Sequence, residues 1–397
     1  MTTVTPRATF ADVLAAPGFR ALLSGFALLL VGETVKMLAL SVLVYASTGS
    51  PLLAALAYVS GFLPHAIGGT FLLALADRWP PRRLLAGYDV IRLAVALILA
   101  LGVLPPLAAT ILVFATGGFA PVAQAARTAL AADLLTGDAY VLGRSLFTTI
   151  SGAMQIVGAA AGGLMLTVTG PYGALWLAAG TCVASALLSR FALPDHPARA
   201  ASSTGAVRET WRVNGALLRD RPVRLLLLAQ WLPGSLMVGA EGVVIPYLAE
   251  LGRPSAAGLL LAAAAAGMLV GDLLVARLVP PALRERLTPW LALVPGAPLL
   301  FYALHPGPLP AALLLALAAA GFAYQLGLAR RFLDAVPVER RGQALGLATT
   351  GTMVSQGLAV AGAGALAEVF TPAVAMAVAG VASLGAALAL WRTLRPA

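Results

Sequence analysis

The residues of this sequence that could do chemistry are a few acids and one lysine placed inside long apolar runs. Glu33 and Lys36 lie three positions apart, so on a helix they share one face. Glu241 lies in an apolar run of the second half of the chain. An ionisable side chain in such a run is costly to bury and marks a candidate site of proton or ion chemistry. We therefore take Glu33, Lys36 and Glu241 as candidates for proton coupling.

Three interpretations of Lys36, the only lysine, stay open at this point. In the first, Glu33 and Lys36 form a local pair that lowers the cost of burying both charges. In the second, Glu33 takes up and releases a proton while Lys36 holds a charge in a cavity. In the third, Lys36 bridges to Glu241 and latches the outer side of the protein closed.

A second group of charges surrounds the turn at residues 74–84, which reads A-L-A-D-R-W-P-P-R-R-L. Proline cannot continue a helix interior, so Pro80 and Pro81 fix a reversal between two apolar runs. In the next apolar run, Asp89 and Arg92 lie three positions apart. Two interpretations of this spacing stay open: a structural ion pair, or a gate that breaks and re-forms. The candidate gate residues are Asp77, Arg78, Arg82, Arg83, Asp89 and Arg92.

The composition indicates which elements must hold these residues. The chain has 397 residues, 60% of them hydrophobic and 11% charged, whereas a soluble domain is about 25% charged. The long apolar runs of the sequence predict membrane-spanning helices, because lipid offers the backbone polar groups no hydrogen-bond partner outside the helix. The net charge of +10 is spread over the connections rather than gathered in one patch. The partner it predicts is therefore a lipid bilayer and not a nucleic acid.

We expect twelve spans and both termini in the cytoplasm. Of the 26 Lys and Arg residues, only Arg253 falls in a connection on the side opposite to the others, apart from Lys36 and Arg92 within spans. Positive charge is retained in the cytoplasm, which sets the orientation. The expected spans are about 19–46, 52–75, 84–104, 107–127, 142–168, 172–193, 223–249, 255–278, 288–304, 309–329, 343–368 and 372–392.

The chain divides into two similar halves. Residues 194–222 form the longest polar stretch and separate a bundle at 1–193 from a bundle at 223–397. Gly143 and Gly152 recur as Gly342 and Gly351 at a constant offset along the chain. This pattern predicts a duplication, two parallel six-helix repeats around one pore. Since one chain supplies both halves, a monomer suffices.

Two motifs carry a resemblance to the major facilitator superfamily. The 74–84 turn resembles the loop between its helices 2 and 3, G-x-L-A-D-R-x-x-R-R, with Leu73 at the first glycine. The predicted span at 142–168 resembles the exporter motif G-x-x-x-G-P-x-x-G-G through Gly158, Gly162 and Gly163. Ala159 replaces the proline of that motif. Small residues also let helices pack closely, which alone accounts for these three glycines.

The resemblance covers nearly the whole chain and is closest to the twelve-helix drug:proton antiporter branch of macrolide-efflux and enterobactin-exporter-like proteins. It implies an all-α membrane protein with the major facilitator fold. It further implies a secondary active transporter of the bacterial plasma (inner) membrane, which exports a small, partly hydrophobic drug, antibiotic or siderophore. The energy source would be the proton gradient, with no cofactor. In this family Asp77 would help to close the cytoplasmic side.

Two alternatives to export are kept. One is an uptake symporter or facilitator on the same fold. The other is a membrane enzyme or a non-transporting sensor, which would need a catalytic constellation or an added soluble domain. The sequence shows neither of these, and it shows no metal-spaced His, Asp and Glu cluster. We therefore expect no enzyme activity and no metal site. Abundant Ala, Gly and Arg with a single Lys suggest a GC-rich bacterial gene.

Polar and aromatic residues on spans that line the pore in this fold are candidates for the substrate cavity, although helix packing explains each of them too. Many drug–proton antiporters carry an arginine in the middle of span 4, whereas Arg127 is expected only at the end of that span. A cavity with few fixed charges suits large, partly apolar or cationic molecules. The candidates are Phe26, Gln124, Gln230, Trp231, Tyr324 and Gln325.

Overall fold

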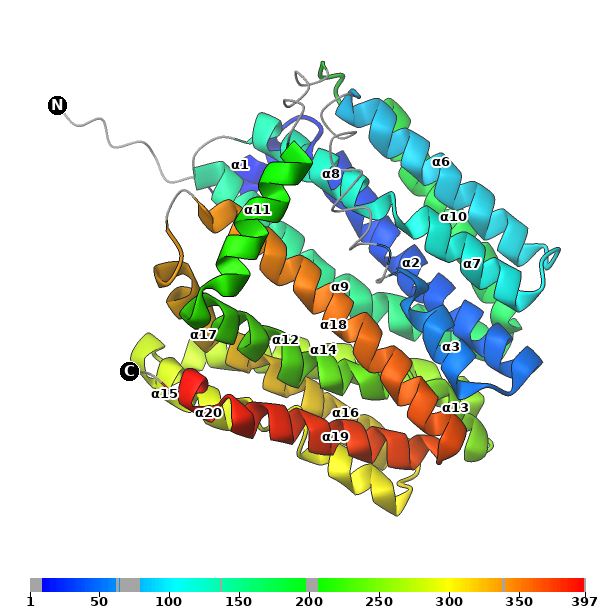
Figure 1. Cartoon of the computed structure of the whole chain (residues 1–397). Helices are drawn as coiled ribbons and strands as arrows, with labels where there is room; N and C mark the ends of the chain where they lie inside the picture. Colours follow the sequence, from blue (N-terminus) through cyan, green and yellow to red (C-terminus); the bar gives the residue numbers. More distant parts are fainter. Residues whose placement is uncertain are drawn as a thin grey trace.

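The computed structural model describes residues 9–61, 64, 79–135, 138–197, 206–337 and 340–395, and every regular element in these ranges is a helix (Figure 1). Proline opens many of the helices, because its fixed φ suits the first helical position and its missing N–H would be unpaired there anyway. Pro51, Pro81, Pro106, Pro308 and Pro372 each occupy that position. The chain therefore turns sharply between long apolar helices.

The first half forms one bundle, in which α2 packs on α9 and α10, and α6 packs on α10. A short helix, α1, precedes it. The helices are α1 (Phe10–Ala15), α2 (Phe19–Thr48), α3 (Pro51–Tyr58) with the 3₁₀ turn η1 (Val59–Gly61), α6 (Pro81–Ala100), α7 (Pro106–Gly117), α8 (Ala120–Leu134), α9 (Asp138–Val168) and α10 (Gly170–Phe191).

The second half forms another bundle, in which α12 packs on α18 and α19, and α14 packs on α16. The helix α11 (Ala206–Arg219) lies between the halves in sequence. The others are α12 (Arg221–Glu241), α13 (Val244–Glu250), η2 (Pro254–Ala256), α14 (Ala257–Leu278), α15 (Pro281–Leu291), η3 (Pro298–Leu304), α16 (Pro308–Ala320), η4 (Gly321–Ala323), α17 (Tyr324–Asp334), α18 (Arg341–Val369), α19 (Pro372–Ala389) and α20 (Trp391–Leu394).

Two differences from the expected spans matter for the site. The span predicted to end at Arg127 continues through α8 to Leu134, because Gly117 and Gly118 only break the helix and do not end the crossing. Arg127 therefore lies seven residues before the helix end, about 10 Å along the axis at 1.5 Å per residue. The polar stretch predicted as a linker also contains a helix, α11.

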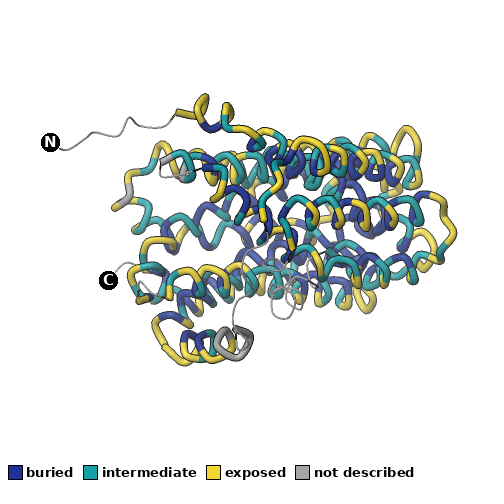
Figure 2. The backbone as a smooth tube through the Cα atoms, turned by 90° about the horizontal axis from the view of Figure 1, so that it is seen from above, coloured by how far each residue is buried: buried dark blue, intermediate teal, exposed yellow. Residues whose placement is uncertain are grey.

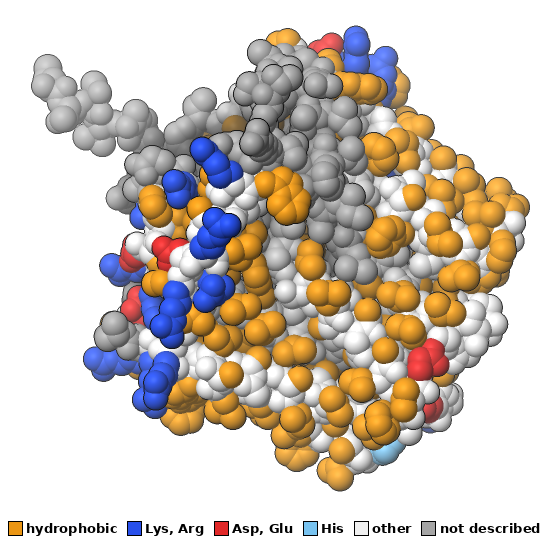
Figure 3. All heavy atoms as spheres, viewed as in Figure 1, with side chains coloured by type: hydrophobic (Ala, Val, Ile, Leu, Met, Phe, Trp, Pro, Cys, Tyr) orange, Lys and Arg blue, Asp and Glu red, His pale blue; other side chains and the backbone are white. Residues whose placement is uncertain are grey.

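The surface of the molecule suits a bilayer. Figure 2 shows buried residues along the inside of the helix packing, with intermediate and exposed residues on the outside. Many of the exposed residues are large and apolar, such as Leu164, Val168 and Leu313. Lys and Arg side chains gather instead at one end of the molecule, at the left and the top of Figure 3. Among the described residues, eight helical stretches are long and apolar enough to cross a membrane. Contiguous exposed apolar surface on this scale indicates contact with lipid.

The two halves contact each other mainly at the end away from the arginines. There α9 packs on α14 and α3 packs on α18. One cluster of buried apolar side chains spans both halves, and it includes Leu38 and Val59 from the first half and Val238 and Val360 from the second. This apolar seal closes the outer end, if the arginine-rich end is cytoplasmic as the positive-inside rule requires.

Candidate functional site: a charged central cavity

A cavity of about 1620 Å³ lies between the halves and reaches the arginine-rich end. Its walls come from α2, α6, α7, α8 and α9 of the first half and from the first three turns of α18 of the second. Trp211 and Asn214 of α11 also line it. Since the apolar seal fills the other end, the cavity is open toward the cytoplasm and closed toward the outside.

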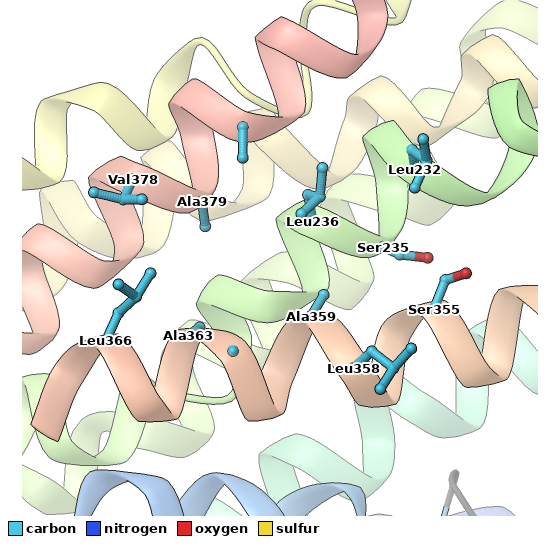
Figure 4. A pocket seen from close by; sticks show the side chains of 12 residues that line it. Leu232, Ser235, Leu236, Ser355, Leu358, Ala359, Ala363, Leu366, Val378 and Ala379 are labelled. Atoms are coloured by element: carbon cyan, nitrogen blue, oxygen red, sulfur yellow. The ribbon is translucent and has the colours of Figure 1, made fainter.

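A second, smaller cavity lies within the second half. It measures about 480 Å³ and is lined by side chains of α12, α18 and α19, including Leu236, Leu358 and Val378 (Figure 4). None of its lining residues is charged. Proton exchange needs an ionisable group, so the larger cavity is the candidate site.

The two predicted pairs join into one chain of charges at the larger cavity, all of them buried except Glu33, whose side chain is 24% exposed. Lys36 Nζ lies 2.7 Å from Glu33 Oε2, and Arg92 Nε lies 2.8 Å from Glu33 Oε1. Arg92 Nη1 in turn lies 3.0 Å from Asp89 Oδ1. The order is therefore Lys36–Glu33–Arg92–Asp89. Glu33 joins α2 to α6, and both of its carboxylate oxygens are occupied by cations.

Asp89 is held from the other side by two serines that sequence analysis did not single out. Ser185 and Ser189 of α10 donate hydrogen bonds of 2.8 Å and 2.9 Å to Asp89 Oδ2. Their spacing of four residues puts both hydroxyls on one helix face, and that i,i+4 pair in an apolar run is the signal that could have found them. Both oxygens of the Asp89 carboxylate thus accept hydrogen bonds, and one chain of polar contacts connects α2, α6 and α10.

We predict that Asp89→Ala destabilises the first half, since it leaves Arg92 with one carboxylate, removes the acceptor of Ser189 and leaves Ser185 only its 3.4 Å bond to Gly25 O. Breaking a buried ion pair by removing one partner costs about 3–5 kcal/mol. Cys182 is free and 3% exposed, so a thiol-reactive dye reports its exposure on heating in detergent. We expect an apparent melting temperature well below that of wild type. The exposed Asp334→Ala serves as control, and a melt of Asp89→Ala equal to it would refute the structural role.

Arg127 also enters the cavity, and sequence analysis did not place it there because the span was expected to end at it. It is 6% exposed. Its Nη1 lies 2.7 Å from Gln124 Oε1, and its guanidinium lies over the Phe26 ring at 5.0 Å. Within the described ranges it makes no ion pair with a carboxylate. The predicted cavity residues Phe26 and Gln124 therefore do line the cavity, where they hold this arginine.

The other predicted cavity residues lie elsewhere. Tyr324 is fully buried and donates to Gln230 O at 3.0 Å, and Trp231 Nε1 donates to Ala348 O at 2.9 Å. Gln325 neighbours Tyr324 on α17. None of Gln230, Trp231, Tyr324 and Gln325 lines the charged cavity. They belong to α12 and α17 of the second half, where the Tyr324 hydroxyl and the Trp231 N–H pair with backbone carbonyls.

The remaining proton-coupling candidate, Glu241, is separate from the charge chain. It ends α12, and its carboxylate faces the Tyr58 hydroxyl of the first half. Lys36 pairs with Glu33 and not with Glu241 among the ion pairs of the described residues. The interpretation of Lys36 as a bridge between the halves is therefore not the arrangement seen.

The predicted gate is only partly described. Asp77 and Arg78 lie outside the described residues. Arg82 donates through Nε to Arg190 O at 2.9 Å, which ties the start of α6 to the end of α10. Arg83 is exposed. The gate residues Asp89 and Arg92 join Glu33 deeper in the membrane, and this connection is the one that their spacing did not reveal.

The predicted glycine motif lies where helices approach most closely. Gly158 and Gly162 face Thr34 and Leu38 of α2. Gly163 faces Gly258 of α14, so that a Cβ on Gly163 would lie 2.7 Å from the Gly258 Cα atom. Two of the three glycines thus pack inside the first half, and the third lies in the contact between the halves at the outer end.

A polar contact reinforces closure at the outer end. Glu368 of α18 accepts a hydrogen bond from the Ser50 hydroxyl and one of 3.2 Å from the Leu52 N–H at the start of α3. A carboxylate at a helix N-terminus is stabilising, because it satisfies unpaired N–H groups and the helix dipole.

We predict that Glu368→Ala favours opening of the outer end. Loss of a helix cap costs about 1 kcal/mol, which is about a fivefold shift in population. On a Cys182→Ser background, Leu38→Cys places a thiol in the apolar seal, and an impermeant maleimide added outside cells labels it only when the seal opens. We expect labelling about fivefold faster with Glu368→Ala. A rate unchanged from the parent would mean that the contact does not hold the seal.

The comparison with protein families decides the family. The model of the Major Facilitator Superfamily matches residues 22–329. The chain belongs to the major facilitator superfamily. It is therefore a multi-pass membrane transporter, and the predicted all-α major facilitator fold is confirmed, with eight long apolar spans and further shorter helices among the described residues. No curated protein matches the sequence.

Solved structures show the same fold at low sequence identity. A POT family transporter in complex with 5-aminolevulinic acid superposes with a TM-score of 0.75 at 10% identity, covering 98% of this chain and 97% of that one. A nucleoside transporter gives 0.73 at 13% identity, covering 95% and 99%. A bacterial homologue of the iron transporter ferroportin in the inward-facing state gives 0.64 at 17% identity, covering 96% and 100%.

Proposed function

We propose that this transporter exports a small, partly hydrophobic molecule in exchange for protons, with Glu33 as the proton carrier. The observation that carries the proposal is the chain Lys36–Glu33–Arg92–Asp89 in the wall of the central cavity. Protonation of Glu33 releases its hold on both cations, and this changes the tie between α2 and α6. A charge change of this kind can bias an alternating-access equilibrium.

Support for export comes from the motifs. The glycines at 158, 162 and 163 resemble the exporter motif, whereas the 74–84 turn resembles a loop of the superfamily as a whole. The cavity is large, and apolar and neutral polar side chains make up most of its wall. These features fit a molecule with a sizeable apolar part, which binds by burial of its surface. The bacterial inner membrane and a monomeric state belong to the same proposal.

A second candidate, proton-coupled uptake, is favoured by one observation. The charged residues that line the described part of the cavity are three cations, Lys36, Arg92 and Arg127, and one carboxylate, Glu33. An excess of positive charge attracts an anion, and protonation of Glu33 would increase that excess. Proton and anion then bind together by linkage, as in cotransport.

The sign of the proton flux separates the two candidates. Inside-out vesicles containing the protein expose the arginine-rich end to the medium. Macrolides, tetracyclines, dyes and siderophores are added singly while an entrapped dye reports the internal pH. Exchange makes the interior more alkaline as substrate enters, whereas cotransport makes it more acid. An alkaline shift with at least one compound is expected. No shift with any compound would contradict the drug-like substrate class.

A further inference from the structure

The arginine on α8 is the one buried cation of the site that lacks a carboxylate among the described residues. The site holds three cations, Lys36, Arg92 and Arg127, and two acids, Glu33 and Asp89. Each acid is in direct contact with other groups, as Glu33 binds Lys36 and Arg92, and Asp89 binds Arg92 and two serine hydroxyls. The described residues of the site therefore carry one more positive than negative charge.

The surroundings of Arg127 prepare it for an oxyanion. A guanidinium has five N–H donors in a planar fork, which matches a carboxylate or phosphate in a bidentate way. Among the described residues, this guanidinium donates a hydrogen bond of 2.7 Å to the neutral amide oxygen of Gln124, and the Phe26 ring lies against it. The amide and the ring hold the group in place without neutralising it. An unneutralised charge at this depth is costly and marks a functional group.

Arg127 belongs to the cavity wall and not to a lipid-facing surface. Gln124, Tyr88 and Lys36 line the same cavity, and Lys36 is 7% exposed. A ligand in the cavity therefore meets Arg127 on the α8 side and the charge chain on the α2 and α6 side. The apolar part of the ligand would contact the aromatic and aliphatic side chains of the cavity wall.

We propose that the transported molecule is an amphipathic organic anion, whose carboxylate or phosphate binds Arg127 while its apolar part fills the rest of the cavity. This inference rests on the proposed function only in that the substrate occupies this cavity. It applies to exchange and to cotransport alike, and it replaces the expected preference for cationic molecules. Charge-assisted bidentate bonds are about twice as strong as neutral ones, so the acidic group decides selectivity among molecules of equal size.

The test measures binding to the purified full chain in phosphatidylcholine nanodiscs, with three probes of one shape. Dansylglycine is an anion, dansylglycinamide is neutral and dansylethylenediamine is a cation. Energy transfer from tryptophan to the dansyl group reports binding, and Trp211 lies in the cavity wall. We expect the anion to bind about tenfold more tightly than the amide, and the cation most weakly.

Variants locate the effect. Arg127→Gln should abolish the preference for the anion, and Arg127→Lys should keep part of it, because the charge stays and the fork is lost. Arg144→Gln, an exposed arginine on the neighbouring α9, is the matched control and should bind as wild type. If Arg127→Gln fails to fold, the wild-type protein still tests the proposal. Raising KCl from about 20 mM to about 500 mM must then weaken the binding of dansylglycine and leave the binding of dansylglycinamide unchanged.

Two results would overturn the proposal. One is equal affinity of wild type for dansylglycine and dansylglycinamide. The other is displacement of dansylglycine by phosphatidylglycerol in the nanodisc but not by soluble phenyl phosphate, which would assign the arginine to a lipid headgroup. Neither result depends on proton flux, so failure of this inference and failure of proton-coupled export are told apart.

Discussion

Substitution of Glu33 by Gln should abolish the substrate-induced pH change in vesicles while leaving the protein in the membrane. Gln cannot gain or lose a proton in the accessible pH range, so a carrier at this position is lost altogether. Its amide oxygen still accepts one bond from Arg92 or Lys36, and the Asp89–Arg92 pair stays intact. We therefore expect normal insertion and a signal at least about tenfold smaller, since no other group takes over the proton.

The design must separate coupling from binding. Substrate counterflow, in which labelled and unlabelled molecules exchange without a proton gradient, should persist in Glu33→Gln. Glu250→Gln, an exposed acid on the other half, is the matched control and should behave as wild type. Full coupling in Glu33→Gln would remove the proton-carrier role from this residue. Loss of both coupling and counterflow would instead indicate that the ion pair with Lys36 is structural, the first interpretation kept from the sequence.

The sequence predicted the fold well for a physical reason. Lipid permits few backbone solutions, so long apolar runs between prolines and arginines define helices, their ends and their orientation. The internal repeat then predicts two bundles. The one consequential error lies at α7 and α8, where Gly117, Gln124 and Arg127 lower the local hydropathy. The span was therefore expected to end at Arg127, although the helix continues for two more turns.

The site was predicted less completely, because sequence spacing reports only neighbours on one helix. It gave Glu33 with Lys36 and Asp89 with Arg92, both three residues apart. It could not give the contact from Glu33 to Arg92, since that depends on how α2 packs against α6. The same limit explains Tyr324 and Trp231, whose polar groups look available along a helix but meet backbone carbonyls of other helices.

The outer contact between the halves should depend on Gly163 more than on any other glycine of its motif. Gly163 and Gly258 let α9 and α14 approach until a Cβ on either would lie within 2.7 Å of the other backbone. Backbone atoms cannot give way as a flexible side chain can. Gly163→Val should therefore keep the outer end from closing, and transport should fall at least about tenfold because one half of the cycle is lost.

Thiol labelling makes this prediction specific to the outer end. With Leu38→Cys on the Cys182→Ser background, Gly163→Val should be labelled from outside at least about tenfold faster than the parent, corresponding to about 1.4 kcal/mol or more against closure. Gly180→Val on α10 is the control, since nothing lies within 4 Å of an added Cβ there. Fast labelling with lost transport would show that the glycine pair forms the outer contact that alternating access requires. Slow labelling with lost transport would instead mean that the motif supports only the packing of the first half, as Gly158 and Gly162 do against α2.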